Sequence, residues 1–265
     1  MKQILEKLQQ LTGCKYIQLT ERGNNSLLIA LTLAKNFLDK ENVLIQNEGG
    51  WITYKQYPKK IGLNIIEVKT NYGLIDLNDL EDKADENSVL LINSTPGYVA
   101  FEDMQKVQDA CKRKNCFLIN DVSGSIGTEN AKFGDIIFGS FGRWKPVNLE
   151  YGGFIAANND KYYEEFDASY FDEHKYDELM EKLNELPKRL EKLQEKRKKI
   201  LEDLQSFEIV HKKSQGINVI IKFDDDETKK RIIDYCKENN LEFTECPRYI
   251  RIKEPAISIE VKRIG

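Results

Sequence analysis

Short apolar runs alternate with helix-like stretches between residues 16 and 158. The runs are about four to eight residues long and show no polar alternation, which is typical of strands buried on both faces of a sheet. We expect strands at 16–20, 42–46, 64–69, 88–93, 116–121, 135–141 and 152–158, and helices at 24–38, 53–62, 77–83 and 101–114. This alternation predicts an α/β domain with a mostly parallel sheet.

The pattern changes after Asp160, where residues 172–205 are dominated by Glu, Lys and Leu. Proline is tolerated in the first turn of a helix but not in its interior, so we expect Pro187 to begin a second helix. The many charges are interpreted as solvated helix faces. Four leucines form a narrow apolar stripe at helical spacing, namely Leu190, Leu193, Leu201 and Leu204.

From residue 207 onward, the chain shows a different order of expected strands and helices. We expect strands at 207–212, 217–223, 249–253 and 256–262, with a helix at 227–239. This mixture predicts a small α+β domain. The expected division is a large domain at 1–165, with an N-terminal helix at 1–15, followed by connecting charged helices and the small C-terminal domain at 166–265.

Composition narrows the class of protein. The net charge is only −4 in 265 residues, so we expect neither a nucleic-acid partner nor a membrane surface. No apolar run approaches the roughly 20 residues that span a bilayer, and the N-terminus does not resemble a signal peptide; a cytoplasmic protein is expected. The five cysteines are odd in number and lack a histidine cluster, so we expect reduced thiols and no metal site.

Two candidate residues follow predicted strands. Asp121 ends a buried strand, at the sheet edge where open α/β folds bind ligands. On its own it would more often be a loop or capping carboxylate. Lys145 follows a strand end and a small-residue turn containing Ser140, where backbone can approach a phosphate and a desolvated amine can act as a nucleophile. On its own it would more often be a surface lysine.

Two further candidates lie at predicted helix starts. Arg22-Gly23-Asn24 precedes a helix whose N-terminus could bind a phosphate, although Asn24 could also be a simple N-cap. Trp51 follows the glycines at 49 and 50 and could stack on a planar ligand or belong to the core.

The spacing of these residues resembles that of a known family. Asp121, Gly127, Gly134-Asp135, Ser140-Phe141, Lys145 and Gly152-Gly153 occur in the order found in DegT-like nucleotide-sugar aminotransferases. These belong to the fold-type-I pyridoxal-phosphate (PLP) dependent transferases, the aspartate aminotransferase superfamily. The resemblance covers roughly residues 16–158 and implies a three-layer α/β/α large domain.

The resemblance also implies residue roles. Lys145 would carry PLP as a Schiff base and move the proton, while Asp121 would pair with the pyridine nitrogen. Ser123 would contact the cofactor, and Trp51 would stack on its ring. Ser140 and the Arg22-Gly23-Asn24 loop would hold its phosphate. The family further implies a homodimer with active sites at the interface, and a small-molecule amino donor and acceptor.

The chain departs from the family at several positions. Arg22-Gly23-Asn24 stands where the family has Ser-Gly-Thr, Gly124 replaces a Gln or His, and Tyr151 replaces an acidic residue. The segment 93–103 looks more like that of cysteine desulfurases and selenocysteine-synthase-like enzymes, and the small domain is shortened. Arg251 resembles the arginine that binds a substrate carboxylate, although it could also lie on the solvated face of a strand.

Three functions remain open. An aminotransferase acting on an amino acid or amino sugar is favoured. A PLP-dependent lyase or transferase of the cysteine desulfurase or selenocysteine-synthase-like branch is the first alternative. A shortened, non-catalytic protein with the PLP fold is the second.

Overall fold

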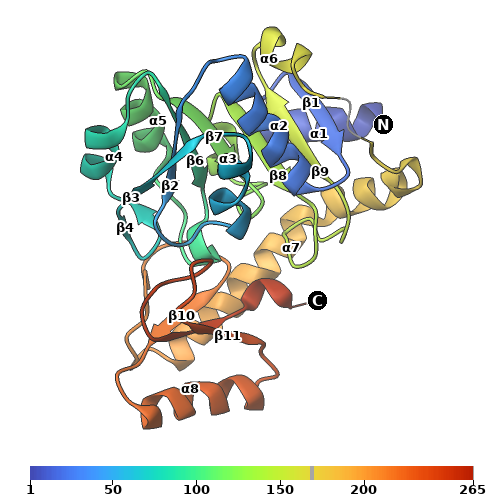
Figure 1. Cartoon of the computed structure of the whole chain (residues 1–265). Coiled ribbons are helices and arrows are strands. Elements are labelled where there is room, and N and C mark those ends of the chain that lie inside the picture. Colours follow the sequence, from blue (N-terminus) through green and yellow to red (C-terminus); the bar gives the residue numbers. More distant parts are fainter. Residues whose placement is uncertain (168–169, 265) are drawn as a thin grey trace.

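A seven-stranded sheet forms the centre of the large domain in the computed structural model, which describes residues 1–167 and 170–264 (Figure 1). Its order is β1 (Tyr16–Thr20), β9 (Gly153–Ala157), β8 (Ile136–Ser140), β7 (Phe117–Asp121), β6 (Ser88–Asn93), β2 (Asn42–Gln46) and β3 (Asn64–Val68). The five strands from β8 to β3 run parallel, and β9 lies antiparallel between β8 and β1. The predicted mostly parallel sheet is therefore confirmed.

Helices cover both faces of this sheet, because successive side chains of its strands point to opposite sides. Ile136 and Phe138 of β8 belong to the cluster under α2, whereas Ile137 belongs to the cluster on the other face. The first face carries α2 (Gly23–Asn36), α3 (Tyr57–Lys60) and α6 (Asp160–Glu164). The second carries α1 (Lys2–Thr12), α4 (Leu77–Lys83), α5 (Met104–Arg113) and the first half of α7 (Tyr176–Asp203). The result is the expected three-layer α/β/α arrangement.

Short elements connect the main helices and strands. The helix expected at 53–62 is a 3-10 turn η1 (Ile52–Lys55) followed by α3, which has Pro58 in its first turn. The helix expected from residue 101 begins at Met104, because the Asp103 side chain accepts a hydrogen bond from the backbone of Lys106 and caps it. The remaining short elements are β4 (Thr70–Asn71), β5 (Leu74–Ile75), η2 (Pro96–Tyr98), η3 (Glu129–Lys132), η4 (Glu173–Lys175) and η5 (Val261–Arg263).

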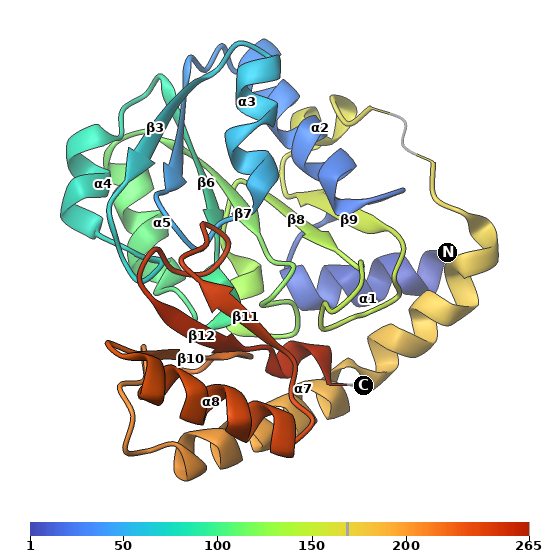
Figure 2. The ribbon, with the colours of Figure 1, turned by 60° about the horizontal axis from the view of Figure 1, so that its bottom comes forward.

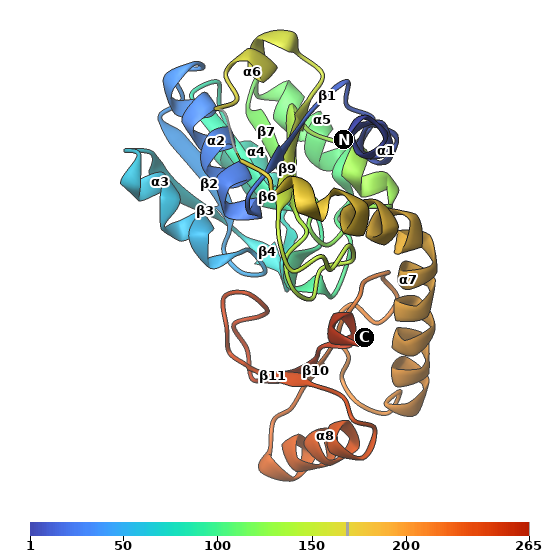
Figure 3. The ribbon, with the colours of Figure 1, turned by 90° about the vertical axis from the view of Figure 1, so that its right-hand side faces the viewer.

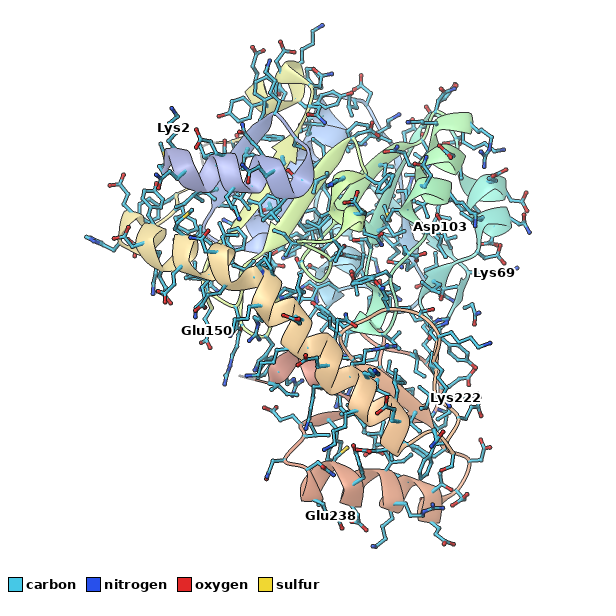
Figure 4. The ribbon with its side chains drawn as sticks, turned by 180° about the vertical axis from the view of Figure 1, so that it is seen from behind. Lys2, Lys69, Asp103, Glu150, Lys222 and Glu238 are labelled. Carbon is cyan, nitrogen blue, oxygen red and sulfur yellow. The ribbon has the colours of Figure 1, made fainter. Side chains whose placement is uncertain are left out.

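The two domains are joined by α7, a single helix of 28 residues (Figures 3 and 4). Pro187 lies inside it, so the prediction that this proline begins a second helix is wrong. Packing explains the continuity. Leu183 and Leu186 are buried against the large domain, whereas Leu193 and Ile200 are buried in the core of the small domain. These contacts hold both halves of the helix in place despite the missing backbone donor.

The small domain holds a three-stranded antiparallel sheet in the order β10 (Val219–Lys222), β12 (Ala256–Ile259) and β11 (Phe243–Cys246), packed against α8 (Asp226–Glu238) (Figure 2). The α+β prediction is confirmed, but its strands differ. Residues 207–212 contribute only an isolated bridge from Ile209, and β11 was missed. Residues 249–253 are not a strand, because the backbone N–H of Arg251 donates to the Arg248 carbonyl and closes a turn. No helix within the described ranges is both long and apolar enough to cross a membrane.

Candidate active site

A cavity of about 420 Å³ lies at the carboxyl ends of the central strands and is closed on one side by the small domain. This volume is within the range of roughly 300–1,000 Å³ that is typical of small-molecule sites. Its lining contains all nine residues singled out from the sequence, which are Arg22, Gly23, Asn24, Trp51, Asp121, Ser123, Ser140, Lys145 and Arg251. Segments from both domains therefore meet at one site.

The first corner of the cavity is the start of α2. Its N-cap is Arg22, in an extended conformation and without a side-chain cap, so the alternative that Asn24 is the N-cap is wrong. Asn24 lies inside the first turn and accepts a hydrogen bond from Thr53 at 3.4 Å. A Cβ on Gly23 would lie 2.5 Å from Cβ of Ser140, so only glycine allows this close packing. A helix N-terminus with a hydroxyl and an arginine beside it suits a phosphate.

The second corner is built around Asp121, the last residue of β7. Its side chain is buried, and its two oxygens accept hydrogen bonds from the Tyr54 hydroxyl at 2.5 Å and the Ser123 backbone N–H at 2.9 Å. Burial and the neighbouring carboxylate raise the pKa of Tyr54 well above its ordinary value, so the phenol remains a donor. Asp121 thus caps the backbone of the following turn and is at the same time an oriented carboxylate that lines the cavity.

Two serines connect these corners. Ser123 Oγ accepts a hydrogen bond from the Ser140 backbone N–H at 2.9 Å. Ser140 Oγ in turn accepts from the Gly142 N–H at 3.1 Å. A serine hydroxyl that accepts in this way still has its own proton to donate. Both serines therefore offer a hydrogen-bond donor to a ligand in the cavity.

Lys145 is half-buried, so a role as an ordinary surface lysine is wrong. It follows β8 in a turn in which its backbone N–H donates to the Gly142 carbonyl at 3.2 Å. Its Nζ forms a hydrogen bond with the Tyr98 hydroxyl and lies 5.3 Å from the centre of the Trp51 ring. Trp51 is 39% exposed and lines the cavity, so the alternative of a core tryptophan is also wrong.

Tyr98 explains why the chain has glycine at position 124. A Cβ on Gly124 would lie 2.9 Å from Cε1 of Tyr98 and 3.1 Å from Cβ of Thr95. The tyrosine ring thus fills the space that a larger side chain at position 124 would need.

The small-domain wall differs from the expected picture. Arg251 is 3% exposed and binds Glu260 through two hydrogen bonds of 2.8 and 2.7 Å, so a position on a solvated face is wrong. Burial alone would raise the pKa of Glu260, but the positive charges of Arg251, Lys262 and Arg263 hold it at about 2. Glu260 is therefore ionised and neutralises part of this wall.

Tyr54, Tyr98 and Lys262 are among the cavity residues that the sequence did not indicate. Tyr54 lies three residues after Trp51, on the same short turn, and helical spacing could have indicated it. Tyr98 lies in the 93–103 segment, whose sequence indicated a departure from the family but no particular residue. No signal in the sequence marked Lys262, because its place depends on the turn at 249–253 and on the register of β12.

The comparisons with known proteins agree with this geometry. The model of the DegT/DnrJ/EryC1/StrS aminotransferase family matches residues 1–177. A second model, the MJ1341 family C-terminal domain, matches residues 173–265. No curated protein matches the chain.

Solved structures show the same fold at low sequence identity. The Helicobacter pylori aminotransferase PseC, involved in the biosynthesis of pseudoaminic acid, has 16% identity and a TM-score of 0.76, covering 98% of this chain and 85% of that one. The E. coli GDP-4-keto-6-deoxy-D-mannose-3-dehydratase with bound hydrated PLP has 14% identity and a TM-score of 0.75, covering 97% and 86%. Bacillus subtilis NtdA with bound cofactor PMP has 16% identity and a TM-score of 0.76, covering 98% and 72%. The chain belongs to the DegT/DnrJ/EryC1/StrS aminotransferase family and is a PLP-dependent transferase of fold type I.

Proposed function

We propose that this protein is an aminotransferase in which Lys145 forms a Schiff base with PLP. The observation that carries the proposal is the place of the Lys145 amine. It faces the cavity beside the Trp51 ring, in the same space as Asp121 and Ser140. These residues fit the cofactor, since a planar ring, a cationic nitrogen and a phosphate each have a matching surface in the cavity.

Each side chain has a distinct task in this proposal. When bound, PLP supplies an electron sink for the carbon that bears the amino group. Asp121 holds the proton on the pyridine nitrogen, and Tyr54 with the Ser123 backbone fixes the direction of that carboxylate. Lys145 moves the proton at the substrate carbon, and the Tyr98 hydroxyl positions its amine.

The phosphate end is assigned to the start of α2. Arg22 lines the cavity, and among the described residues no carboxylate lies within ion-pairing distance of it. Ser140 adds a hydroxyl donor beside Gly23. This set replaces the Ser-Gly-Thr of the family, with the arginine supplying charge in place of a hydroxyl.

Two lysines line the cavity, and a covalent label distinguishes them. Borohydride reduction of the PLP-loaded protein should fix the cofactor on the peptide that contains Lys145 and not on the one that contains Lys262. Lys145→Ala should abolish the label, and Lys262→Met should retain it. Labelling of Lys262, or no uptake of PLP by the wild-type chain, would overturn the proposal.

The desulfurase alternative lacks a nucleophile in the cavity. All five cysteines are buried, and none lines the cavity in the described part of the chain. Burial raises the pKa of Cys14 and of Cys236 to about 11, which disfavours the reactive thiolate. Transamination is therefore preferred to sulfur transfer.

A homodimer remains part of the proposal. Trp51, at the mouth of the cavity, and the adjacent Ile52 are exposed by 39% and 49%, and such an apolar pair suits a partner surface. Sedimentation equilibrium should give twice the chain mass of 30.8 kDa. Ile52→Glu should shift the protein toward the monomer, and a monomeric wild-type protein would contradict this part.

A further inference from the structure

Lys262 is a buried amine without a hydrogen-bond acceptor. It lies in η5, lines the cavity and has a side chain only 7% exposed. Its Nζ is 4.2 Å from the centre of the Tyr98 ring, and the nearest carboxylate oxygen, on Glu260, is 3.8 Å away. That distance is beyond a hydrogen bond. In the described residues the amine therefore has no hydrogen-bonded partner.

The neighbouring cations are already engaged. Arg251 directs Nε and Nη2 to Glu260, and Nη1 donates to the Ile250 carbonyl at 2.7 Å. Arg263 binds the more exposed Glu242 at 2.8 Å. Glu260 is thus one buried carboxylate that faces three basic side chains. Among the described residues, Lys262 is the one of the three that forms no hydrogen bond with a carboxylate.

The whole cavity has an excess of basic groups. Arg22, Arg143, Lys145, Arg251, Lys262 and Arg263 line it, against the acidic Asp121 and Glu150. A cleft with one prevailing sign of charge attracts ligands of the opposite sign. With Arg22 assigned to the cofactor phosphate, the excess on the small-domain wall is available to a substrate.

The charge of Lys262 responds to its surroundings. Burial lowers its pKa first, and Arg251 and Lys145 lower it further, to about 6, while Glu260 opposes them. The Arg263 guanidinium also lowers it, and Arg189 of α7 contacts the Lys262 carbonyl. An anion that enters beside this amine would stabilise its protonated form.

We propose that Lys262, rather than Arg251, receives the carboxylate of a small amino acid or 2-oxo acid, and that it takes up a proton as the anion binds. Lys145 Nζ and Lys262 Nζ both contact Tyr98: the first is hydrogen-bonded to its hydroxyl, and the second lies 4.2 Å from the centre of its ring. A small ligand beside Tyr98 can therefore present its reacting carbon to Lys145 and a carboxylate to Lys262, whereas a phosphate of a nucleotide-linked sugar is many bonds from the reacting carbon. The inference rests on the proposed aminotransferase function.

The test is calorimetric titration of the PLP-loaded protein with pyruvate in two buffers that differ in ionisation heat. Because pyruvate carries no amine, the measurement reports binding alone. Proton uptake should approach one per ligand near pH 7.5 and vanish near pH 5. Affinity should fall about tenfold per pH unit above the pKa of Lys262, since the bound form needs the extra proton.

Two substitutions separate a binding role from a structural one. Lys262→Met is similar in volume and should weaken pyruvate binding at least tenfold while retaining PLP. Lys262→Arg, which stays charged, should bind pyruvate without proton uptake. Lys237→Met, on the exposed face of α8, is the matched control and should behave as wild type.

Other outcomes would overturn the inference. They are wild-type affinity for pyruvate in Lys262→Met, absence of proton uptake in the wild type, or tighter binding of inorganic phosphate than of pyruvate at the same site. Failure of the proposed function is distinguishable, because it would appear as no PLP uptake or as labelling of a residue other than Lys145. The two intrinsic tryptophans, Trp51 and Trp144, both line the cavity and report pyruvate binding by fluorescence even without cofactor.

Discussion

The two domains beside the cavity use buried carboxylates in opposite ways. Glu260 of the small domain is 1% exposed, and its cationic neighbours hold its pKa at about 2. Glu102 of the large domain is 6% exposed and forms no ion pair with any described cation, so burial raises its pKa to about 8. The first is an ion and the second a neutral acid at the same pH, although both are glutamates in a similar degree of burial.

The difference shows how each wall is stabilised. On the large-domain side, polar groups are held by hydrogen bonds from neutral donors, as Asp121 is by Tyr54 and Ser123. On the small-domain side, the described residues hold a buried ion pair and beside it a buried amine without a hydrogen-bonded partner. Hydrogen bonds fix the geometry of a site for a cofactor that stays bound, whereas an amine without a partner suits a ligand that enters and leaves.

The largest expected effect is that of Lys145→Ala on the large-domain wall. Amino transfer should fall by about a thousandfold or more, because both the covalent link and the proton carrier are removed. The measurement is 2-oxo acid release from a panel of amino acids. Activity at the wild-type level would show that another amine performs the reaction.

In the small domain, Glu260→Gln should destabilise the protein by about 3–5 kcal/mol, because the Arg251 guanidinium would remain buried without a counter-charge. Urea unfolding at neutral pH measures this change. The control is Glu242→Gln, whose carboxylate is more than half exposed and should contribute less than about 1 kcal/mol. An equal loss of stability in the two variants would mean that a group other than Glu260 neutralises the buried Arg251 guanidinium.

The sequence predicted the residues of the large-domain wall far better than those of the small-domain wall. The Asp121, Ser140 and Lys145 positions follow strand ends, and local pattern determines where parallel strands end. The small-domain wall depends on a turn at Arg248–Arg251 and on the edge strand β11, which brings Arg263 to Glu242. Such tertiary contacts leave no periodic signal, so Arg251 was found by resemblance alone and Lys262 was missed.

Pro187 illustrates the same limit. Local preference predicted a break in the helix, because proline removes one backbone hydrogen bond. The two hydrophobic cores at the ends of α7 outweigh that cost. The local preference and the tertiary packing oppose each other here, and only the structure reveals which prevails.

A smaller effect is expected for Tyr54→Phe. Asp121 would lose its 2.5 Å hydrogen bond while remaining buried, at a cost of about 1.5–3 kcal/mol. Thermal unfolding measures the loss, and PLP titration should show weaker retention because the carboxylate is less well oriented. Tyr57→Phe on α3 is the control. Identical behaviour of the two variants would show that Asp121 is oriented by its backbone partner alone.

The last prediction concerns Glu102 and the free energy of unfolding, whose change within one pH unit is the smallest of these effects. Its carboxyl accepts hydrogen bonds from the Ile75 N–H at 2.9 Å and the Gln46 amide at 3.1 Å, and burial raises its pKa from 4.5 to about 8. Between those values the folded chain holds a proton that the unfolded chain has released. The free energy of unfolding therefore falls as pH rises, by at most about 1.4 kcal/mol per unit.

Glu102→Gln should remove this slope, because the amide retains one acceptor oxygen and cannot ionise. The variant and the wild type should differ little near pH 4.5, and the variant should be the more stable one at pH 8. Urea unfolding at both pH values tests this, with Glu86→Gln on the exposed surface as the control. A variant that keeps the wild-type slope would show that Glu102 is ionised in the folded chain. The contrast between a neutral buried glutamate in the large domain and an ionised one in the small domain would then be lost, since both would be ions.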